Sequence, residues 1–249
     1  MLRFFQPMLL ATLLPGFLQA QSLAQRVSAA EDGTVRVSFP ARPGTCGDLG
    51  NGVRLGVRSD EWQPDCGPQL VRVALRVREH QVYSLRAYVG GHWVPDTAAT
   101  DLGTVRPQEA APYFLSLAER PDGERISGDP LLPAVLADSV TIWPALARVA
   151  RSPRSSNQIR GRAVFWLGQV AAAAAGAALD SIAGDQHTDH EVRRQAVFAL
   201  SQRPADQSVP ALIRIARTSP SADLRKTAIF WLGQSEDPRA IDLFEELLR

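Results

Sequence analysis

Two periods of hydrophobic residues divide the chain into two parts. Between residues 35 and 89 apolar residues alternate with polar ones, as at Val35, Val37 and Phe39. A period of two is typical of strands with one buried face. From residue 130 onward the apolar residues recur about one helical turn apart, as in amphipathic helices. The pattern predicts an α+β fold, in which a small N-terminal antiparallel sheet is followed by helices.

The helical part contains three copies of one six-residue sequence motif, called here the phrase. The copies, VFWLGQ, VFALSQ and IFWLGQ, begin at Val164, Val197 and Ile229. A second apolar segment follows each copy at the same step. A step of about 33 residues is typical of stacked helical hairpins rather than of one closed core. We expect A helices, which carry the phrase, at 157–170, 188–202 and 221–234, B helices at 140–151, 173–183, 206–217 and 237–248, and a degenerate first A helix at 130–138.

These repeats resemble a known family. The motif Arg-x-x-Ala-x-Phe-Trp-Leu-Gly-Gln and the turn Asp237-Pro238-Arg239-Ala240 are similar to the short bacterial HEAT repeats, which are related to the HEAT-like repeats of phycobilin lyases. The whole layout resembles secreted bacterial HEAT repeat domain-containing proteins. The resemblance covers 130–249 and implies an all-α solenoid of helical hairpins. By analogy with the lyases, it also leaves open an enzyme that handles a small ligand.

The N-terminal part predicts a small β-rich module over 31–120. Alternation predicts strands at 35–39, 53–57, 71–77 and 83–89, the last two joined as a hairpin around 79–81. The spacing changes to a helical one over 107–119, so we expect one helix to cover the apolar face of the sheet. A polar linker at 121–129 then leads into the repeats.

Arginines occupy the alternate, polar positions of these strands. The same alternation that buries the valines places the arginines on the solvated face, where two interpretations remain open. They form either an anion-binding surface or an ordinary wet face. The residues are Arg36, Arg54, Arg72, Arg76 and Arg86.

The first residues predict export. Arg3 precedes a short apolar run at 8–14, and Pro15-Gly16 interrupts it before the small residues Ala20 and Ala24. This pattern is typical of a signal peptide, and the run is too short to span a bilayer. We expect a leader within 1–24, cleaved after Ala20 or Ala24, a periplasmic or secreted bacterial location, and no stable membrane insertion of the mature chain.

Cys46 and Cys66 are the two cysteines of the chain. An even number in an exported protein favours a disulfide, here closing a loop of about 20 residues worth about 3 kcal/mol. Two thiols without a nearby histidine do not complete a zinc site.

Charge and motifs limit the function. A net charge of +1 argues against nucleic acid as a partner. The densest group of potential metal ligands, at 185–191, matches no known zinc spacing and also suits a helix N-terminus, so we expect no metal and no cofactor. No nucleophile elbow, phosphate loop or dinucleotide fingerprint occurs in the sequence. We therefore predict a protein that is not an enzyme.

Two in-register series bear on the repeat surface. The sequence predicts that Phe165, Phe198 and Phe230 pack between helices, with Trp166 and Trp231 on the outside. On that placement Phe198→Ala would cost about 3–5 kcal/mol as a core truncation.

Arginines recur in register as well, and we interpret Arg160, Arg193 and Arg225 as candidate partner-binding residues. Guanidinium groups in a row suit an acidic partner segment. The alternative is a structural ladder between repeats, in which each arginine binds an acid or a helix-end carbonyl of the next repeat. The sequence thus predicts a scaffold or adaptor that binds a protein or peptide along its repeats.

Overall fold

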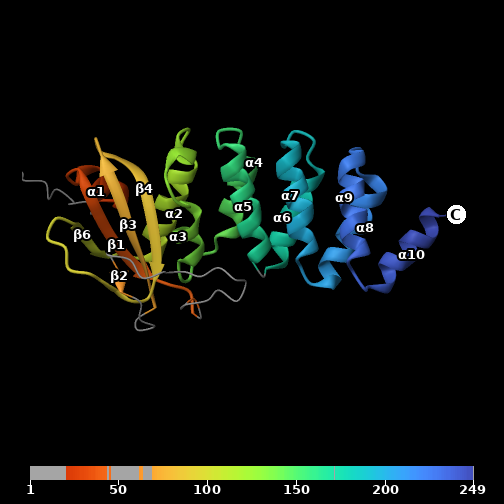
Figure 1. Cartoon of the computed structure of the whole chain (residues 1–249), viewed down its shortest axis with the longest axis horizontal. Helices are drawn as coiled ribbons and strands as arrows, with labels where there is room; N and C mark the ends of the chain where they lie inside the picture. The colour runs from red at the N-terminus through yellow and green to blue at the C-terminus, as the bar shows by residue number, and fades with distance from the viewer. Residues whose placement is uncertain (1–20, 44, 46–61, 64–68, 171, 249) are drawn as a thin grey trace, which may run out of the picture.

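The computed structural model describes the chain except for residues 1–20, 44, 46–61, 64–68, 171 and 249. A sheet lies at one end and helical hairpins follow it in a single row toward the C-terminus (Figure 1). The predicted α+β fold with a helical solenoid is confirmed. Cys46, Cys66, Arg54 and the expected strand at 53–57 lie outside the described residues, so the disulfide stays a prediction.

The main sheet has four strands in the order β4-β3-β1-β6. β1 (Gly33–Pro40) pairs antiparallel with β3 (Leu70–Arg78), which forms a hairpin with β4 (Gln81–Val89). Glu79 and His80 turn this hairpin, and both have the positive φ of a left-handed pair, whose twist suits the adjoining strands. The sheet is mixed rather than purely antiparallel, because β6 (Thr100–Thr104) pairs parallel with β1. A short second pairing joins β2 (Trp62–Gln63) to β5 (His92–Trp93).

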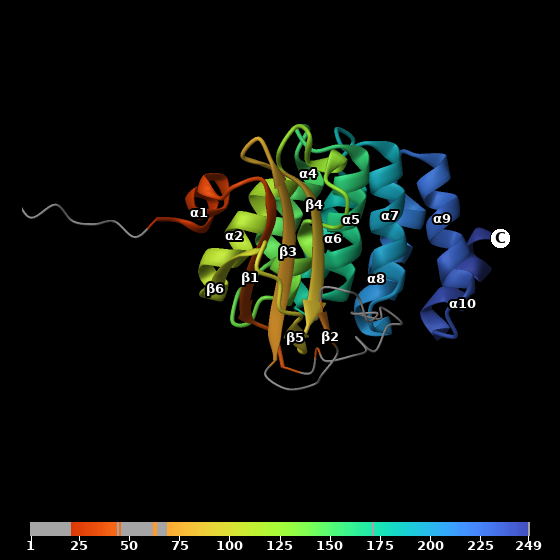
Figure 2. The same cartoon turned by 60° about the vertical axis from the view of Figure 1, so that its left-hand side comes forward.

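Helices cover one face of the main sheet. Phe39 of β1 meets Phe114 of α2 (Pro107–Ala118) with ring centroids 5.8 Å apart, and α1 (Leu23–Ala29) packs against α2. Figure 2 shows the strands lying in front of α2. The predicted covering helix is therefore present, and it buries the alternating valines of β1 and β3.

The opposite face is less wet than the alternation predicts. Arg36 is only 4% exposed, because its guanidinium lies 4.9 Å from the centre of the Trp93 ring and donates to the carbonyl of Val94 at 2.9 Å. Such a cation over an aromatic face is an attractive contact. Arg72 is half-buried and donates to the carbonyls of Gly90 and Gly91, and desolvation lowers its pKa. Arg76 and Arg86 are exposed, as expected. The alternation did not predict that the segment around β5 would cover Arg36 on this face of the sheet.

The repeats alternate A and B helices close to the predicted positions. Serine or aspartate caps begin the three full A helices, as at Ser156, Asp189 and Ser221. The A helices are α3 (Leu131–Leu136), α5 (Asn157–Gln169), α7 (His190–Ser201) and α9 (Ala222–Gly233), and the B helices are α4 (Trp143–Arg151), α6 (Ala173–Gly184), α8 (Ala205–Thr218) and α10 (Pro238–Leu247).

One hydrophobic core runs from the sheet through the repeats to Leu243. The segment 121–129 joins it through a short 3-10 helix, η1 (Gly123–Arg125), with Ile126 buried. Asp129 accepts a hydrogen bond from the indole nitrogen of Trp166 at 3.1 Å, and Arg162 donates to the carbonyl of Gly128 at 2.8 Å. The first full repeat therefore holds this segment in place. Among the described helices, none is long and apolar enough to cross a membrane.

Candidate partner-binding face

Three phenylalanines stand exposed on consecutive A helices. Phe165, Phe198 and Phe230 are 43%, 44% and 58% exposed, and we call them the aromatic row. The sequence-based placement of these rings in the core is wrong. A helix turns by about 100° per residue, and the buried stripe of α5 is formed by Ala163, Val164 and Leu167. Phe165 therefore points to the side of the helix opposite the stripe.

The neighbouring tryptophans support the aromatic row from within. Trp166 does not lie on the outside as predicted: it is 6% exposed, and its indole nitrogen donates to Asp129. Trp231 is half-buried and its ring centroid lies 5.1 Å from that of Phe198 on the preceding A helix. Phe165 and Phe230 each contact the tryptophan next in sequence, with centroids 5.0 Å apart. Each phenylalanine of the aromatic row therefore packs on a tryptophan on one side and is exposed to solvent on the other.

A groove of about 780 Å³ lies between α5 and α7. Phe165 and Phe198 line it, and small residues separate the two helices, since a Cβ on Gly168 would lie 3.2 Å from that of Ala199. The polar lining comes from side-chain amides and one guanidinium. Those groups belong to Gln158, Gln169, Gln195, Gln202 and Arg162.

Glutamine recurs one turn beyond each phenylalanine. Gln169, Gln202 and Gln234 are exposed, and we call them the glutamine row. A side-chain amide has two N–H donors and one acceptor oxygen, the kinds of group that pair with a peptide backbone, and one donor of Gln202 binds the Ser201 hydroxyl at 3.1 Å. The two rows run side by side across the A helices, since both stand at fixed register positions.

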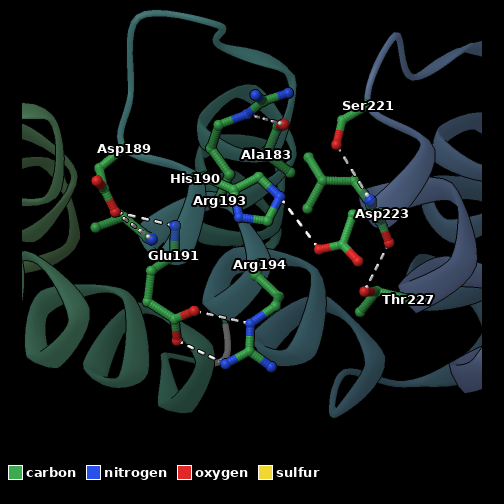
Figure 3. Close-up of polar contacts among 11 residues, drawn as sticks. Ala183, Asp189, His190, Glu191, Arg193, Arg194, Ser221, Asp223 and Thr227 are labelled. Atoms are coloured by element: carbon green, nitrogen blue, oxygen red, sulfur yellow. Dashed lines mark hydrogen bonds and ion pairs between the residues drawn. The ribbon is translucent and has the colours of Figure 1, made fainter.

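The charges near the aromatic row are largely paired with one another. Arg194 donates to both carboxylate oxygens of Glu191, at 2.8 Å from Nε and 2.7 Å from Nη2 (Figure 3). These bonds lower the pKa of Glu191. His190 of α7 lies 3.2 Å from the carboxylate of Asp223 on α9. None of the described residues that line the groove carries a carboxylate. The face is therefore close to neutral, because Asp223 and Lys226, both on α9, carry opposite charges.

The acidic segment 185–191 serves the helix start. Asp185 accepts from the backbone N–H of His187 at 3.0 Å and from the Thr188 hydroxyl at 2.8 Å. Both bonds lower the pKa of Asp185. Asp189 caps α7 by accepting from the N–H of Glu191. Within the part of the chain that the structure describes, no three His, Cys, Asp or Glu side chains come together as metal ligands.

The arginines predicted to bind a partner form hydrogen bonds within the chain. Arg193 is 7% exposed and donates from Nε to the carbonyl of Ala183, at the end of α6, at 3.1 Å. Arg225 donates from Nη1 to the carbonyls of Ser219 and Pro220 after α8, at 2.8 Å and 3.2 Å. Arg160 donates to the side-chain oxygen of Asn157. Arg193 and Arg225 therefore bind helix-end carbonyls, as in the ladder alternative, but those of the preceding repeat rather than the next one. Partner binding by the series stays a prediction.

Sequence reasoning missed Arg203, which ties two repeats together. Its side chain is buried and donates to the carbonyls of Val170 and Ala172 in the preceding repeat, at 2.8 Å and 3.1 Å, and to Gln207. Gly176 gives it room, since a Cβ there would lie 2.9 Å from the arginine Nε. The in-register positions are Val170 and Ser235, so no periodic signal marks this arginine.

Comparisons with known proteins identify the repeats. Residues 176–249 match the family model for HEAT repeats, and the C-terminal part is built of HEAT-like repeats. The chain is 34% identical over 108 residues to the bilin biosynthesis protein PecE of Mastigocladus laminosus, covering 41% of this chain and 40% of that protein. The chain thus spans well under half of the length of this relative. No solved structure matches the chain.

Proposed function

We propose that this protein is an exported scaffold that binds a protein or peptide along the exposed face of its A helices. One observation carries the proposal: three phenylalanines, 43%, 44% and 58% exposed, occupy the same register position on three consecutive A helices. Contiguous exposed apolar side chains in a soluble protein mark interaction sites, and aromatic residues supply much of the energy of protein interfaces. The glutamine row adds hydrogen-bonding groups beside them.

Export is proposed from the leader pattern at 1–24 together with the start of α1. Ser22 and Gln25 form a capping box, and Leu23 is 1% exposed. Cleavage after Ala20 would leave this helix complete, whereas cleavage after Ala24 would remove its cap and a buried side chain. The proposed location of the mature protein is the periplasm or the medium.

Site-specific photocross-linking in the native bacterium tests the scaffold. A benzoyl-phenylalanine at position 198 should give an adduct with another protein, and the yield should fall when Phe165 and Phe230 are changed to serine. The same probe at Tyr83, an aromatic residue of β4 that is 44% exposed, is the matched control. Equal adducts from both positions, or none from position 198, would refute a specific aromatic face.

The arginine series is the alternative set of residues that would contact the partner. Arg225 is half-buried, so its guanidinium is the more accessible one compared with that of Arg193. Loss of the adduct in Arg225→Ala, with melting unchanged, would move the contact from the aromatic row to the arginines. An unchanged adduct would leave these residues a structural role.

A second candidate is a small-ligand protein related to bilin chemistry. The groove between α5 and α7 has the size of many small-molecule sites. The similar PecE is named for bilin biosynthesis. The prediction that the chain is not an enzyme stays a prediction beside this candidate. Titration with a bilin should then change the pigment's absorption spectrum in the wild type but not in Phe165→Ala/Phe198→Ala. An identical spectrum with and without protein would dismiss this candidate.

A further inference from the structure

We propose that the aromatic and glutamine rows bind a neutral, proline-rich segment in the polyproline II conformation, running across the A helices. This inference rests on the proposed function and specifies the chemistry of its partner. It starts from the step between equivalent side chains. Packed helices lie about 8–10 Å apart, and α5, α7 and α9 pack on one another in sequence.

The conformation of the partner follows from that step. A segment that crosses the helices must present an equivalent group about every 8–10 Å. Polyproline II repeats one face every three residues at about 3.1 Å each, or about 9.3 Å. A β-strand repeats one face every two residues, or about 6.7 Å, and an α-helix about every 5.4 Å. A polyproline II segment therefore matches the step with one repeat of its own. One or two repeats give about 6.7 or 13.4 Å for a β-strand and about 5.4 or 10.8 Å for an α-helix, all outside the range of the step.

The chemistry of the two rows fits the same segment. Aromatic-lined grooves are a recurrent way of docking proline-rich peptides, whose rings pack on the exposed aromatic faces. The backbone of polyproline II makes no internal hydrogen bonds, so its carbonyls are available to the amides of the glutamine row. Because this conformation is already formed in solution, little entropy is lost when it binds.

Charge selects a neutral segment. The described lining of the groove contains no carboxylate to attract a basic peptide. Arg162 lies 4.0 Å from the carboxylate of Asp129, and Glu191 is paired with Arg194. Asp223 and Lys226, both on α9, carry opposite charges, so the net charge along the face is close to zero. Two steps between three phenylalanines correspond to about six residues of polyproline II, so about nine residues fill the face.

Peptide binding measured by fluorescence anisotropy tests the inference on the full mature chain. The probe is a labelled peptide of about nine residues with the repeat Pro-Pro-Leu. Its control has the same composition with the leucines moved out of the three-residue register. We expect saturable binding of the probe, at least tenfold weaker binding of the control, and at least tenfold weaker probe binding by Phe198→Ala.

Tyr83→Ala is the matched protein control, because Tyr83 is also 44% exposed but lies on the sheet. It should bind the probe within twofold of the wild type. Equal binding of probe and control peptide, equal weakening by Tyr83→Ala, or no saturable binding overturns the inference. A self-association that Phe198→Ala abolishes would instead make a second copy of the chain the occupant.

The two proposals fail differently. A cross-link from position 198 to a protein segment without a proline-rich run would leave the scaffold standing and overturn the polyproline inference. Absence of both the cross-link and the peptide complex would overturn both. Circular dichroism of Phe198→Ala tests whether unfolding causes the loss of binding. Because the ring is 44% exposed, we expect the variant to keep the wild-type spectrum.

Discussion

Phe198→Ala and Leu200→Ala compare an exposed and a buried residue on the same helix. Phe198 is 44% exposed, whereas Leu200 is 2% exposed. Both residues lie in α7, so local helix propensity and position in the array are nearly matched. The two substitutions therefore differ chiefly in how deeply the truncated side chain is buried.

The expected costs follow from this burial. Complete burial of a phenylalanine is worth about 1.5–3 kcal/mol, so the roughly half-buried ring of Phe198 contributes about 1 kcal/mol. Its contact with Trp231 adds about 0.5–1 kcal/mol. No closed cavity forms at a site open to solvent, so the total is about 1.5–2 kcal/mol. Leu200→Ala leaves a cavity in the core and should cost about 2–5 kcal/mol.

Urea denaturation followed by circular dichroism measures both variants. Because repeat arrays need not unfold in one step, the midpoints and slopes of the two variants are compared with the wild type under identical conditions. A cost for Phe198→Ala equal to or above that of Leu200→Ala would refute the exposed position of the ring. It would also remove the basis of the proposed binding face.

Three further predictions concern other parts of the chain. Arg203→Met should cost about 2–4 kcal/mol in chemical denaturation, because it leaves two backbone carbonyls without their donor at about 1–3 kcal/mol each. Arg194→Met, at an exposed ion pair, should cost about 1 kcal/mol or less, and equal costs would argue against the tie between repeats. Hydrogen bonding to the Arg239 side chain lowers the pKa of Asp237 to about 2. Because the folded-state pKa is the lower one, this stabilisation is present above about pH 4 and is lost as the pH falls toward about 2. Asp237→Asn should flatten the fall of the melting temperature in this interval at low salt, and an unchanged profile would contradict the assignment. If the proposed leader is cleaved after Ala20, mass spectrometry of the protein from its native host should find Gln21 at the N-terminus, whereas an intact Met1 would contradict export and a start at Gln25 would show that α1 loses its cap.

The register of the phenylalanines shows what a pattern can decide. Helix geometry alone puts Phe165 opposite Ala163, Val164 and Leu167, so its exposure was readable from the sequence. The error came from giving an aromatic residue more weight than its position on the helix. The exposed acids of the A helices were equally readable as capping and pairing groups, as Asp189 and Glu191 show.

No periodic pattern in the sequence predicted the parallel strand β6 or the burial of the sheet arginines. β6, with the sequence TDLGT, lacks an alternation of large apolar residues and pairs with β1 from more than sixty positions away along the chain. Arg36 occupies a regular polar position, yet Trp93 and Val94 cover it. Contacts between distant segments of this kind leave no local periodicity.

By itself, the sequence determined the two-part α+β organisation, the HEAT-like repeats and nearly all helix positions, because burial of one face imposes a period on each element. Only the tertiary structure decided which groups meet between elements: Arg203 with the preceding repeat, Phe198 with Trp231, and the amides with the groove. The physical reason is that such contacts depend on how far apart and at what angle neighbouring helices pack. Those quantities are properties of the assembled core and of no single segment.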